Sequence, residues 1–259
     1  MIRQFIVDAF TDRVFHGNPA AVCVLLDWLP EETMTAIAAE NNLSETAFAV
    51  PEGDCYQLRW FTPKAEVDLC GHATLAAGFV ILNEYAPQAE QVRFVTRQSG
   101  ALTVRRTDAG YAMDFPAYTL HQVPVTEAMT AAIGMRPLEA WMARDLVCVL
   151  PDEASVRRYT PDAAAVAALD GLLLHTTAPG AEADMVTRSF GPKVGIEEDP
   201  VCGSGHCHTA VLWARKLGKN ELHAVQASPR GGMLHCSLRG DRLILAGQAV
   251  LFEEGMLHV

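Results

Sequence analysis

A diverged internal repeat most strongly limits the folds open to this chain of 259 residues. Four residues of the first half return 129 positions later, in the same order and spacing. The two sets are Arg59, Phe61, Pro63 and Lys64, then Arg188, Phe190, Pro192 and Lys193. A Cys-Gly pair follows each set, first Cys70-Gly71 and then Cys202-Gly203. Two copies at this period are too few for a solenoid, so the repeat predicts two similar lobes.

The distribution of strand-like and helix-like segments predicts an α+β fold. Runs rich in β-branched and aromatic residues alternate with few helices, which we expect at 30–41, 73–83 and 205–217, the last ended by Gly218. We predict an N-terminal lobe at 1–116 and a C-terminal lobe at 117–259, with the last strand able to return to the N-terminal lobe. Each lobe is expected to be a curved, mostly antiparallel sheet wrapped around a central helix, and the lobes to be pseudo-symmetric.

Charge and cysteine content narrow the partners and the compartment. The formal net charge of -11 leaves no basic stripe for phosphates, so we expect no nucleic-acid partner and no attraction to an anionic membrane surface. The first ten residues lack the pattern of a signal peptide, and no stretch reaches the roughly 18 apolar residues of a membrane span. Seven scattered cysteines form no disulfide framework. We therefore predict a cytoplasmic protein with free thiols and a small-molecule substrate.

The two helix starts after the Cys-Gly pairs are the candidate functional site. A helix N-terminus offers unpaired backbone N–H groups and a partial positive charge, which bind carboxylates and favour the thiolate form of a nearby cysteine. Lobes related by duplication are expected to direct both ends at one cleft. Such a cleft would place a carboxylate substrate between Cys70 and Cys202, an arrangement suited to moving a proton from one position to another. The simpler alternative is that both cysteines only fill space at helix starts.

Five segments in order resemble the motifs of the PhzF-like phenazine-biosynthesis family. They are DAFTDRVFHGNPAAVCVL, AAENNLSETAFAV, RWFTPKAEVDLCGHATLAAG, EEDPVCGSGHCHTAVLWA and SPRGGMLHCSLRGDRLILAGQAV. The family is similar in fold to diaminopimelate epimerase, with two pseudo-symmetric lobes, each a sheet rolled about a central helix. The resemblance implies an isomerase with no cofactor and no metal, acting on a small carboxylate, either amino acid-like or a cyclic dihydro-hydroxy acid. It also implies a homodimer.

The resemblance assigns roles by position within these motifs. Glu45 of NLSETAF would carry the proton, a task that requires its carboxyl group to be partly removed from water. His72 and Asp199 match supporting catalytic residues. The substrate would be bound by Asn18, Ser44, Gly71, Gly203, Ser204 and Gly205.

Cys202 departs from the family pattern, where threonine is common. With Cys-Gly in both lobes, the chain resembles two-cysteine racemases and epimerases, and a mechanism using Cys70 and Cys202 is the alternative. A metal site built from these cysteines and from His72, His206, Cys207 and His208 has poor ligand spacing. A catalytically idle binding protein on the same fold is a third possibility. Arg59 and Arg188 suit either ion pairs or a substrate clamp.

Overall fold

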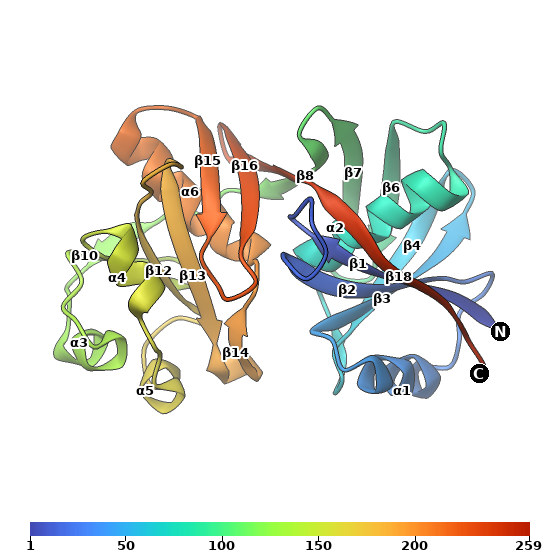
Figure 1. Ribbon diagram of the computed structural model, residues 1–259, viewed down its shortest axis with the longest axis horizontal. Coiled ribbons are helices and arrows are strands. Elements are labelled where there is room, and N and C mark those ends of the chain that lie inside the picture. Colours follow the sequence, from blue (N-terminus) through green and yellow to red (C-terminus); the bar gives the residue numbers. More distant parts are fainter. The chain divides into compact units, whose positions relative to one another are not determined.

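The chain divides into two compact units, as described by a computed structural model that covers residues 1–259. Unit 1 consists of Met1–Asp114 and Ala246–Val259, and unit 2 of Phe115–Leu245. Each unit contains a mixed sheet and one largely buried helix, α2 in unit 1 and α6 in unit 2 (Figure 1). The predicted α+β class, with a sheet and a central helix in each half, is confirmed.

Unit 1 has nine strands, with one helix outside its sheet and one inside. Its elements are β1 (Ile2–Ala9), β2 (Asn18–Val24), α1 (Glu31–Asn41), β3 (Glu45–Glu52), β4 (Cys55–Phe61), β5 (Glu66–Val67), α2 (Gly71–Val80), the π-helical turn η1 (Ile81–Tyr85), β6 (Gln91–Thr96), β7 (Ala101–Thr107), β8 (Gly110–Pro116) and β18 (Ala249–Leu257). Two pairs are parallel, β2 with β3 and β4 with β6. The pairs of β1 with β2, β3 with β4, β6 with β7 and β7 with β8 are antiparallel.

Unit 2 repeats this element order with additions. Its elements are β9 (His121–Val123), α3 (Glu127–Ile133), β10 (Glu139–Met142), β11 (Leu146–Val149), α4 (Glu153–Arg158), α5 (Ala163–Ala167), β12 (Leu174–Pro179), β13 (Met185–Gly191), the 3-10 turn η2 (Pro192–Val194), β14 (Ile196–Asp199), α6 (Gly203–Leu217), β15 (Glu221–Gln226), β16 (Gly232–Arg239) and β17 (Arg242–Gly247), which runs to the unit boundary. The parallel pairs are β11 with β12 and β13 with β15.

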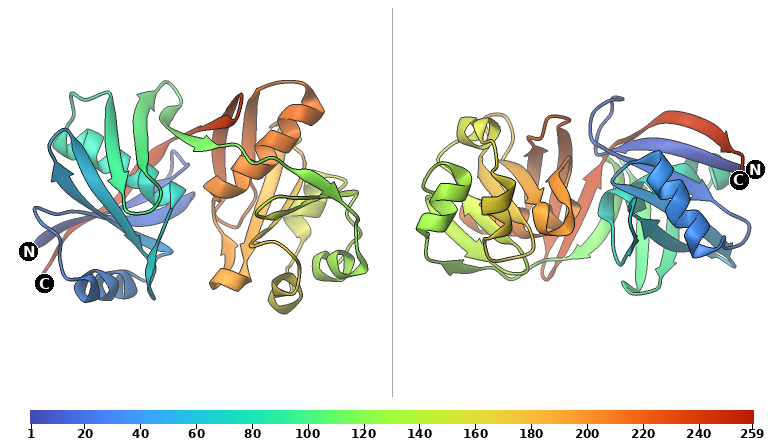
Figure 2. Two further views of the ribbon diagram at one scale, coloured as in Figure 1. Left: turned by 180° about the vertical axis from the view of Figure 1, so that it is seen from behind. Right: turned by 90° about the horizontal axis from the view of Figure 1, so that it is seen from below.

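The parallel pairs show that the repeat seen in the sequence is a repeat of topology. The pair β2–β3 is bridged by the outer helix α1 and the pair β11–β12 by the outer helices α4 and α5, while the other parallel pair of each unit is bridged by the central helix. Figure 2 shows α2 in teal and α6 in orange, each lying against the strands of its own unit. The Cys-Gly pairs therefore occupy equivalent places, at the start of the two central helices.

Both central helices begin two residues earlier than the sequence predicted. They start at Gly71 and Gly203, with Cys70 and Cys202 as the N-cap residues. In α2 the backbone approaches β7 so closely that a Cβ on Gly78 would lie 2.5 Å from Val104, which only glycine avoids. The helix α6 ends as predicted at Gly218, which adopts the left-handed conformation at φ 66°.

The strand β3 carries Glu45 and was not predicted. Its residues Glu45–Val50 are buried without interruption, so the alternation that marks a one-sided strand is absent. Phe48 packs with Met34 and Ile37 of α1 on one face of the sheet. The opposite face of β3 packs against α2. Because a helix covers each face of β3, its sequence is a short apolar run. Such a run does not distinguish a strand from a buried helix.

Three short helices of unit 2, α3, α4 and α5, were also not predicted. Each has a side-chain N-cap that could have revealed it, namely Thr126, Asp152 and Asp162. At the other end of the chain, β18 pairs antiparallel with β1, so that Ile2 lies opposite Leu257 and the two termini lie side by side (Figure 1). None of the helices has both the length and the apolar character needed to cross a bilayer.

Candidate active site

Glu45 and His72 form a buried polar pair at the centre of unit 1. Glu45 is the first residue of β3 and lies opposite Ala20 of the parallel strand β2. His72 is in the first turn of α2, and its Nε2 lies 3.2 Å from Glu45 Oε2. The two residues are only 7% and 6% exposed. The removal from water that a proton-carrying glutamate requires is therefore present at Glu45.

Asn18 selects the tautomer of His72, and burial keeps the ring neutral. Asn18 Nδ2, which can only donate, lies 3.1 Å from His72 Nδ1, so that Nδ1 accepts. Burial lowers the pKa of His72 to about 3. A neutral ring whose Nδ1 accepts must carry its proton on Nε2, the nitrogen that faces Glu45. The carboxylate thus faces an N–H group rather than a second acceptor.

Cys70 and Gly71 complete this cluster, which we call the Glu45 site (Asn18, Glu45, Cys70, Gly71 and His72). Cys70 Sγ lies 3.5 Å from His72 Nδ1, and the thiol is buried. Gly71 begins α2 and is half-buried, so its backbone is partly accessible. Ser44, predicted to bind substrate, lies half-buried in the bend that immediately precedes Glu45. The sequence-predicted residues of unit 1 are therefore together in space.

The residues predicted in unit 2 gather at the start of α6. Cys202 Sγ accepts a hydrogen bond from the Gly205 amide at 3.3 Å and lies 3.5 Å from Ser204 Oγ. Gly203 is the first helical residue and is buried. Asp199 ends β14 just before the helix, and its Oδ1 accepts from the Val201 amide at 3.2 Å.

Cys202 does not have the thiolate character that the helix dipole alone predicted. Burial raises the pKa of Cys202 well above its ordinary value, and the charge of Asp199 raises it further. Hydrogen bonds from Ser204 and Gly205 act in the opposite direction and are outweighed. The helix dipole acts only within the first turn. The free energy by which it stabilises a thiolate is small compared with the cost of burying a charge. At neutral pH Cys202 is a thiol.

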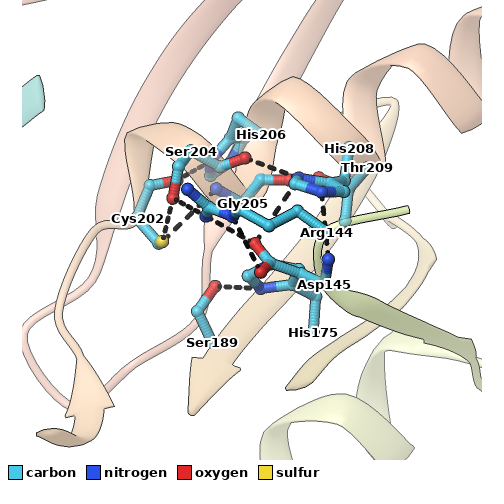
Figure 3. A network of polar contacts seen from close by, with 10 residues as sticks. All are labelled: Arg144, Asp145, His175, Ser189, Cys202, Ser204, Gly205, His206, His208 and Thr209. Carbon is cyan, nitrogen blue, oxygen red and sulfur yellow. Dashed lines mark hydrogen bonds and ion pairs between the residues drawn. The ribbon is translucent and has the colours of Figure 1, made fainter. Parts of the chain in front are cut away.

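A second polar network, which the sequence did not reveal, lies beneath the start of α6. Figure 3 shows Arg144 lying across the first turn of the helix toward Ser204, with Asp145 and His175 below it. Arg144 Nη2 donates to Ser204 Oγ at 2.9 Å, and the guanidinium also makes two bonds to Asp145, at 3.0 and 2.6 Å. His175 Nε2 donates to the same carboxylate at 3.1 Å. The only sequence signal was an Arg-Asp pair just before a buried strand.

Arg59 and Arg188, left open between two roles, are both ion-pair partners. Arg59 is 4% exposed and binds Glu66 at 2.6 Å and Glu31 at 2.8 Å. Its repeat equivalent Arg188 binds Glu198 at 2.7 Å. Each arginine therefore ties a central strand, β4 or β13, to the short strand that follows it, β5 or β14.

Two groups of side chains are close enough to hold a metal ion, one in each unit. They are Glu45, Cys70 and His72, and Asp145, His175 and His208. In the second group both nitrogens of His208 are engaged, Nδ1 with the Ser204 carbonyl at 2.8 Å and Nε2 with the Asp145 amide at 3.3 Å. His175 is likewise engaged at both nitrogens, with Asp145 and with Ser189 Oγ. Those rings have no free lone pair for a metal. Of the ligands considered from the sequence, Cys70 and His72 lie in the first group and His208 in the second, whereas Cys202, His206 and Cys207 lie in neither.

Comparison with known proteins places this fold among the epimerase-like α+β proteins. A predicted epimerase from Pseudomonas aeruginosa has a TM-score of 0.72 at 16% identity, with both chains covered in full, which shows a shared fold. A PhzF family protein from Enterococcus faecalis has a TM-score of 0.97 at 48% identity, covering 100% of this chain and 99% of that one.

The sequence comparison identifies the family. The sequence model of the phenazine biosynthesis-like (PhzC-PhzF) proteins matches residues 7–255. A protein of Pseudomonas aeruginosa named as an uncharacterized isomerase is 46% identical over 255 residues, which is 98% of both chains. The chain belongs to the phenazine biosynthesis-like family, as its motifs indicated.

Proposed function

We propose that this protein is an isomerase that moves a proton within a small carboxylate substrate without a cofactor, with Glu45 as the proton carrier. The observation that carries the proposal is the buried Glu45–His72 pair, in which burial keeps His72 neutral and Asn18 leaves the ring proton on Nε2. The isomerase names of relatives and the epimerase-like fold support the same reaction class. The substrate is proposed to be amino acid-like or a cyclic dihydro-hydroxy acid.

Each residue has a proposed task. Glu45 takes a proton from one carbon and returns it to another, so that no net proton is gained or lost. The Nε2–H of His72 lies 3.2 Å from Glu45 Oε2, and the neutral ring does not neutralise the carboxylate by forming an ion pair. Gly71 at the start of α2, and Gly203, Ser204 and Gly205 at the start of α6, are the proposed substrate-binding residues, because helix N-termini bind anions. Asp199, Asn18 and Ser44 are proposed to support and orient the substrate.

Strand register supports one glutamate rather than a symmetric pair of bases. Phe61 and Phe190 are repeat equivalents, and they lie opposite Thr46 and Leu174 respectively. Glu45, which precedes Thr46, is therefore matched in unit 2 by Leu173. The carboxylate at this place is unique to unit 1, as expected for one group that both removes and returns a proton.

The alternative is a racemase or epimerase that uses Cys70 and Cys202. One observation favours it: both thiols occupy the N-cap positions of equivalent helices. Such a mechanism needs each thiol in turn to act as a thiolate base. The raised pKa of Cys202 opposes this, since removing the proton from a buried thiol beside Asp199 is unfavourable.

Solvent deuterium uptake distinguishes the two mechanisms. The protein is incubated in D2O with a panel of small carboxylates, including both enantiomers of common amino acids, trans-4-hydroxy-L-proline and cyclic dihydro-hydroxy amino acids, and loss of C–H signals is followed by NMR. We expect Glu45→Gln to abolish exchange. Glu52→Gln is the matched control, because Glu52 lies at the exposed end of the same strand. We expect Cys70→Ser and Cys202→Ser to retain turnover.

Each mechanism has an outcome that refutes it. Exchange that survives in Glu45→Gln refutes the glutamate mechanism. Exchange lost in both cysteine variants, with each still folded, would establish the thiol mechanism instead. If no carboxylate of the panel exchanges with the wild-type protein, the proposed reaction class is refuted for the substrates tested. The homodimer implied by the family resemblance is checked separately by the molar mass in solution.

A further inference from the structure

The network beneath α6 contains a serine, a histidine and an aspartate at the distances of a hydrolytic triad. Ser189 Oγ lies 3.0 Å from His175 Nδ1, and His175 Nε2 lies 3.1 Å from Asp145 Oδ2. All three residues are 0% exposed. The backbone of α6 closes the space above Ser189, since a Cβ on Gly205 would lie 3.0 Å from Ser189 Oγ. No substrate reaches this serine, so the network serves another purpose.

The network holds Arg144 in place. Asp145 Oδ1 and Oδ2 each accept one hydrogen bond from the guanidinium of Arg144, and Oδ2 also accepts one from His175. Burial alone would raise the pKa of Asp145, but the hydrogen bonds from His175 and Arg144 outweigh it and keep the pKa well below its ordinary value. Asp145 is thus a permanent buried anion, and a buried anion fixes its cationic partner in one geometry.

The rest of the guanidinium is held by ring stacking. Arg144 lies 5.4 Å from the centre of the Tyr118 ring, and Tyr118 stacks on His208 at 3.9 Å with an interplanar angle of 16°. The Arg144 side chain nevertheless keeps 34% of its exposure, while Asp145 has none. Arg144 therefore extends from a rigid buried anchor to the partly exposed start of α6, where Nη2 meets Ser204.

We propose that Arg144 is a positioning residue that fixes the hydroxyl of Ser204 for substrate binding. A guanidinium can only donate, so Ser204 Oγ must accept from it. The single proton of the hydroxyl is then directed away from Arg144, toward Cys202 or toward a bound carboxylate. Without Arg144, the hydroxyl can rotate and present a lone pair where the substrate anion binds. This inference rests on the proposed function, in which Ser204 binds the carboxylate.

The repeat provides independent support. Thr46 and Leu174 are equivalent by register, and they lie opposite Ala21 and Leu146 in the neighbouring parallel strands. Arg144 lies two residues before Leu146, so its equivalent in unit 1 is Pro19. Pro19 is the residue that follows Asn18. By the same repeat, Ser204 is equivalent to His72, two residues after the matched cysteine. In both units a residue at or just before the start of a parallel strand, Asn18 or Arg144, contacts the second residue of the central helix.

A double-mutant cycle on Arg144 and Ser204 tests the inference, with benzoate as the anionic probe and benzamide as its uncharged isostere. Arg144→Lys keeps the charge that Asp145 requires, so the fold is protected, but it loses the fork that reaches Asp145 and Ser204 together. We expect Arg144→Lys and Ser204→Ala each to weaken benzoate binding about tenfold, the scale of one charge-assisted hydrogen bond. The double variant should be no weaker than either single variant, and benzamide binding should change little.

Arg136→Met is the matched control, because Arg136 is an exposed arginine of the same unit that pairs only with Glu127. Thermal unfolding of each variant confirms that the fold is intact. Benzoate binding that is unchanged in Arg144→Lys, or effects of the two substitutions that multiply, would overturn the inference and leave the Glu45 mechanism untouched. If the two substitutions have coupled effects on benzoate binding but the wild-type protein exchanges no proton of any carboxylate, only the proposed isomerase reaction is refuted.

Discussion

Replacing His206 by asparagine should make the protein less sensitive to mild acid. His206 lies in α6 and is 0% exposed, and its Nδ1 donates to the Cys202 carbonyl at 2.8 Å. Burial lowers its pKa to about 4. In the unfolded chain histidine takes up a proton near pH 6.5, whereas the folded protein resists protonation down to about pH 4. The unfolded state therefore binds more protons in this window, and stability falls as the pH falls from 6.5 toward 4.

The size of the effect follows from the two pKa values. Between pH 7 and pH 5 the loss in unfolding free energy due to His206 is about 2 kcal/mol. His72 and His208, whose pKa values burial lowers to about 3 and about 4, act in the same direction. Together the three give about 6 kcal/mol, which is comparable with the whole stability of a typical domain at about 5–15 kcal/mol.

Urea unfolding at pH 7 and pH 5 measures this directly. His206→Asn keeps an N–H donor close to the position of Nδ1 and removes the titrating group, so its loss between the two pH values should be about 2 kcal/mol smaller than that of the wild type. His121→Asn is the control, because His121 is exposed. An identical loss in wild type and His206→Asn, or equal wild-type stability at both pH values, would refute the reasoning.

Three further predictions concern the two polar centres. Gly205→Ala should lower the unfolding free energy by about 1–3 kcal/mol in thermal melts, because the new Cβ would lie 2.8 Å from the His175 ring; full stability would show that the ring can move aside. Arg59→Met should cost about 2 kcal/mol, since both partner carboxylates keep some contact with water, and should leave the KM for an exchanging carboxylate unchanged. A raised KM would restore the substrate-clamp role. Cys202 should react with iodoacetamide at pH 8 far more slowly than free cysteine, and rapidly once the chain unfolds in urea, as followed by mass spectrometry; fast labelling of the folded protein would contradict the raised pKa.

The sequence revealed the features that depend on neighbours along the chain. The repeat of Arg59 and Arg188 predicted two similar halves, and the Cys-Gly pairs located the two central helices to within two residues. Gly218 correctly marked the end of α6, because a left-handed helix terminus is a local demand that glycine meets. The motif resemblance singled out Glu45 and His72, which the structure brings within 3.2 Å of each other.

Only the tertiary structure showed whether the helix dipole or burial determines the protonation state of Cys202. At Cys202 the helix dipole and burial act in opposite directions on the thiol, and burial depends on everything packed around it. The strand β3 has no periodic signal, because a helix covers each of its faces.

The sequence by itself determined the repeat, the central helices and the residue types at their starts. The structure decided how those residues are held, and the Arg144 network is the clearest case. Arg144 and Ser204 are 60 positions apart, and Asp145 and His175 are 30 apart. Such contacts form only when β11, β12 and α6 have packed together, and no local pattern encodes them. Local propensity and spacing act between near neighbours, whereas charge pairing and burial are set by residues that folding alone brings together.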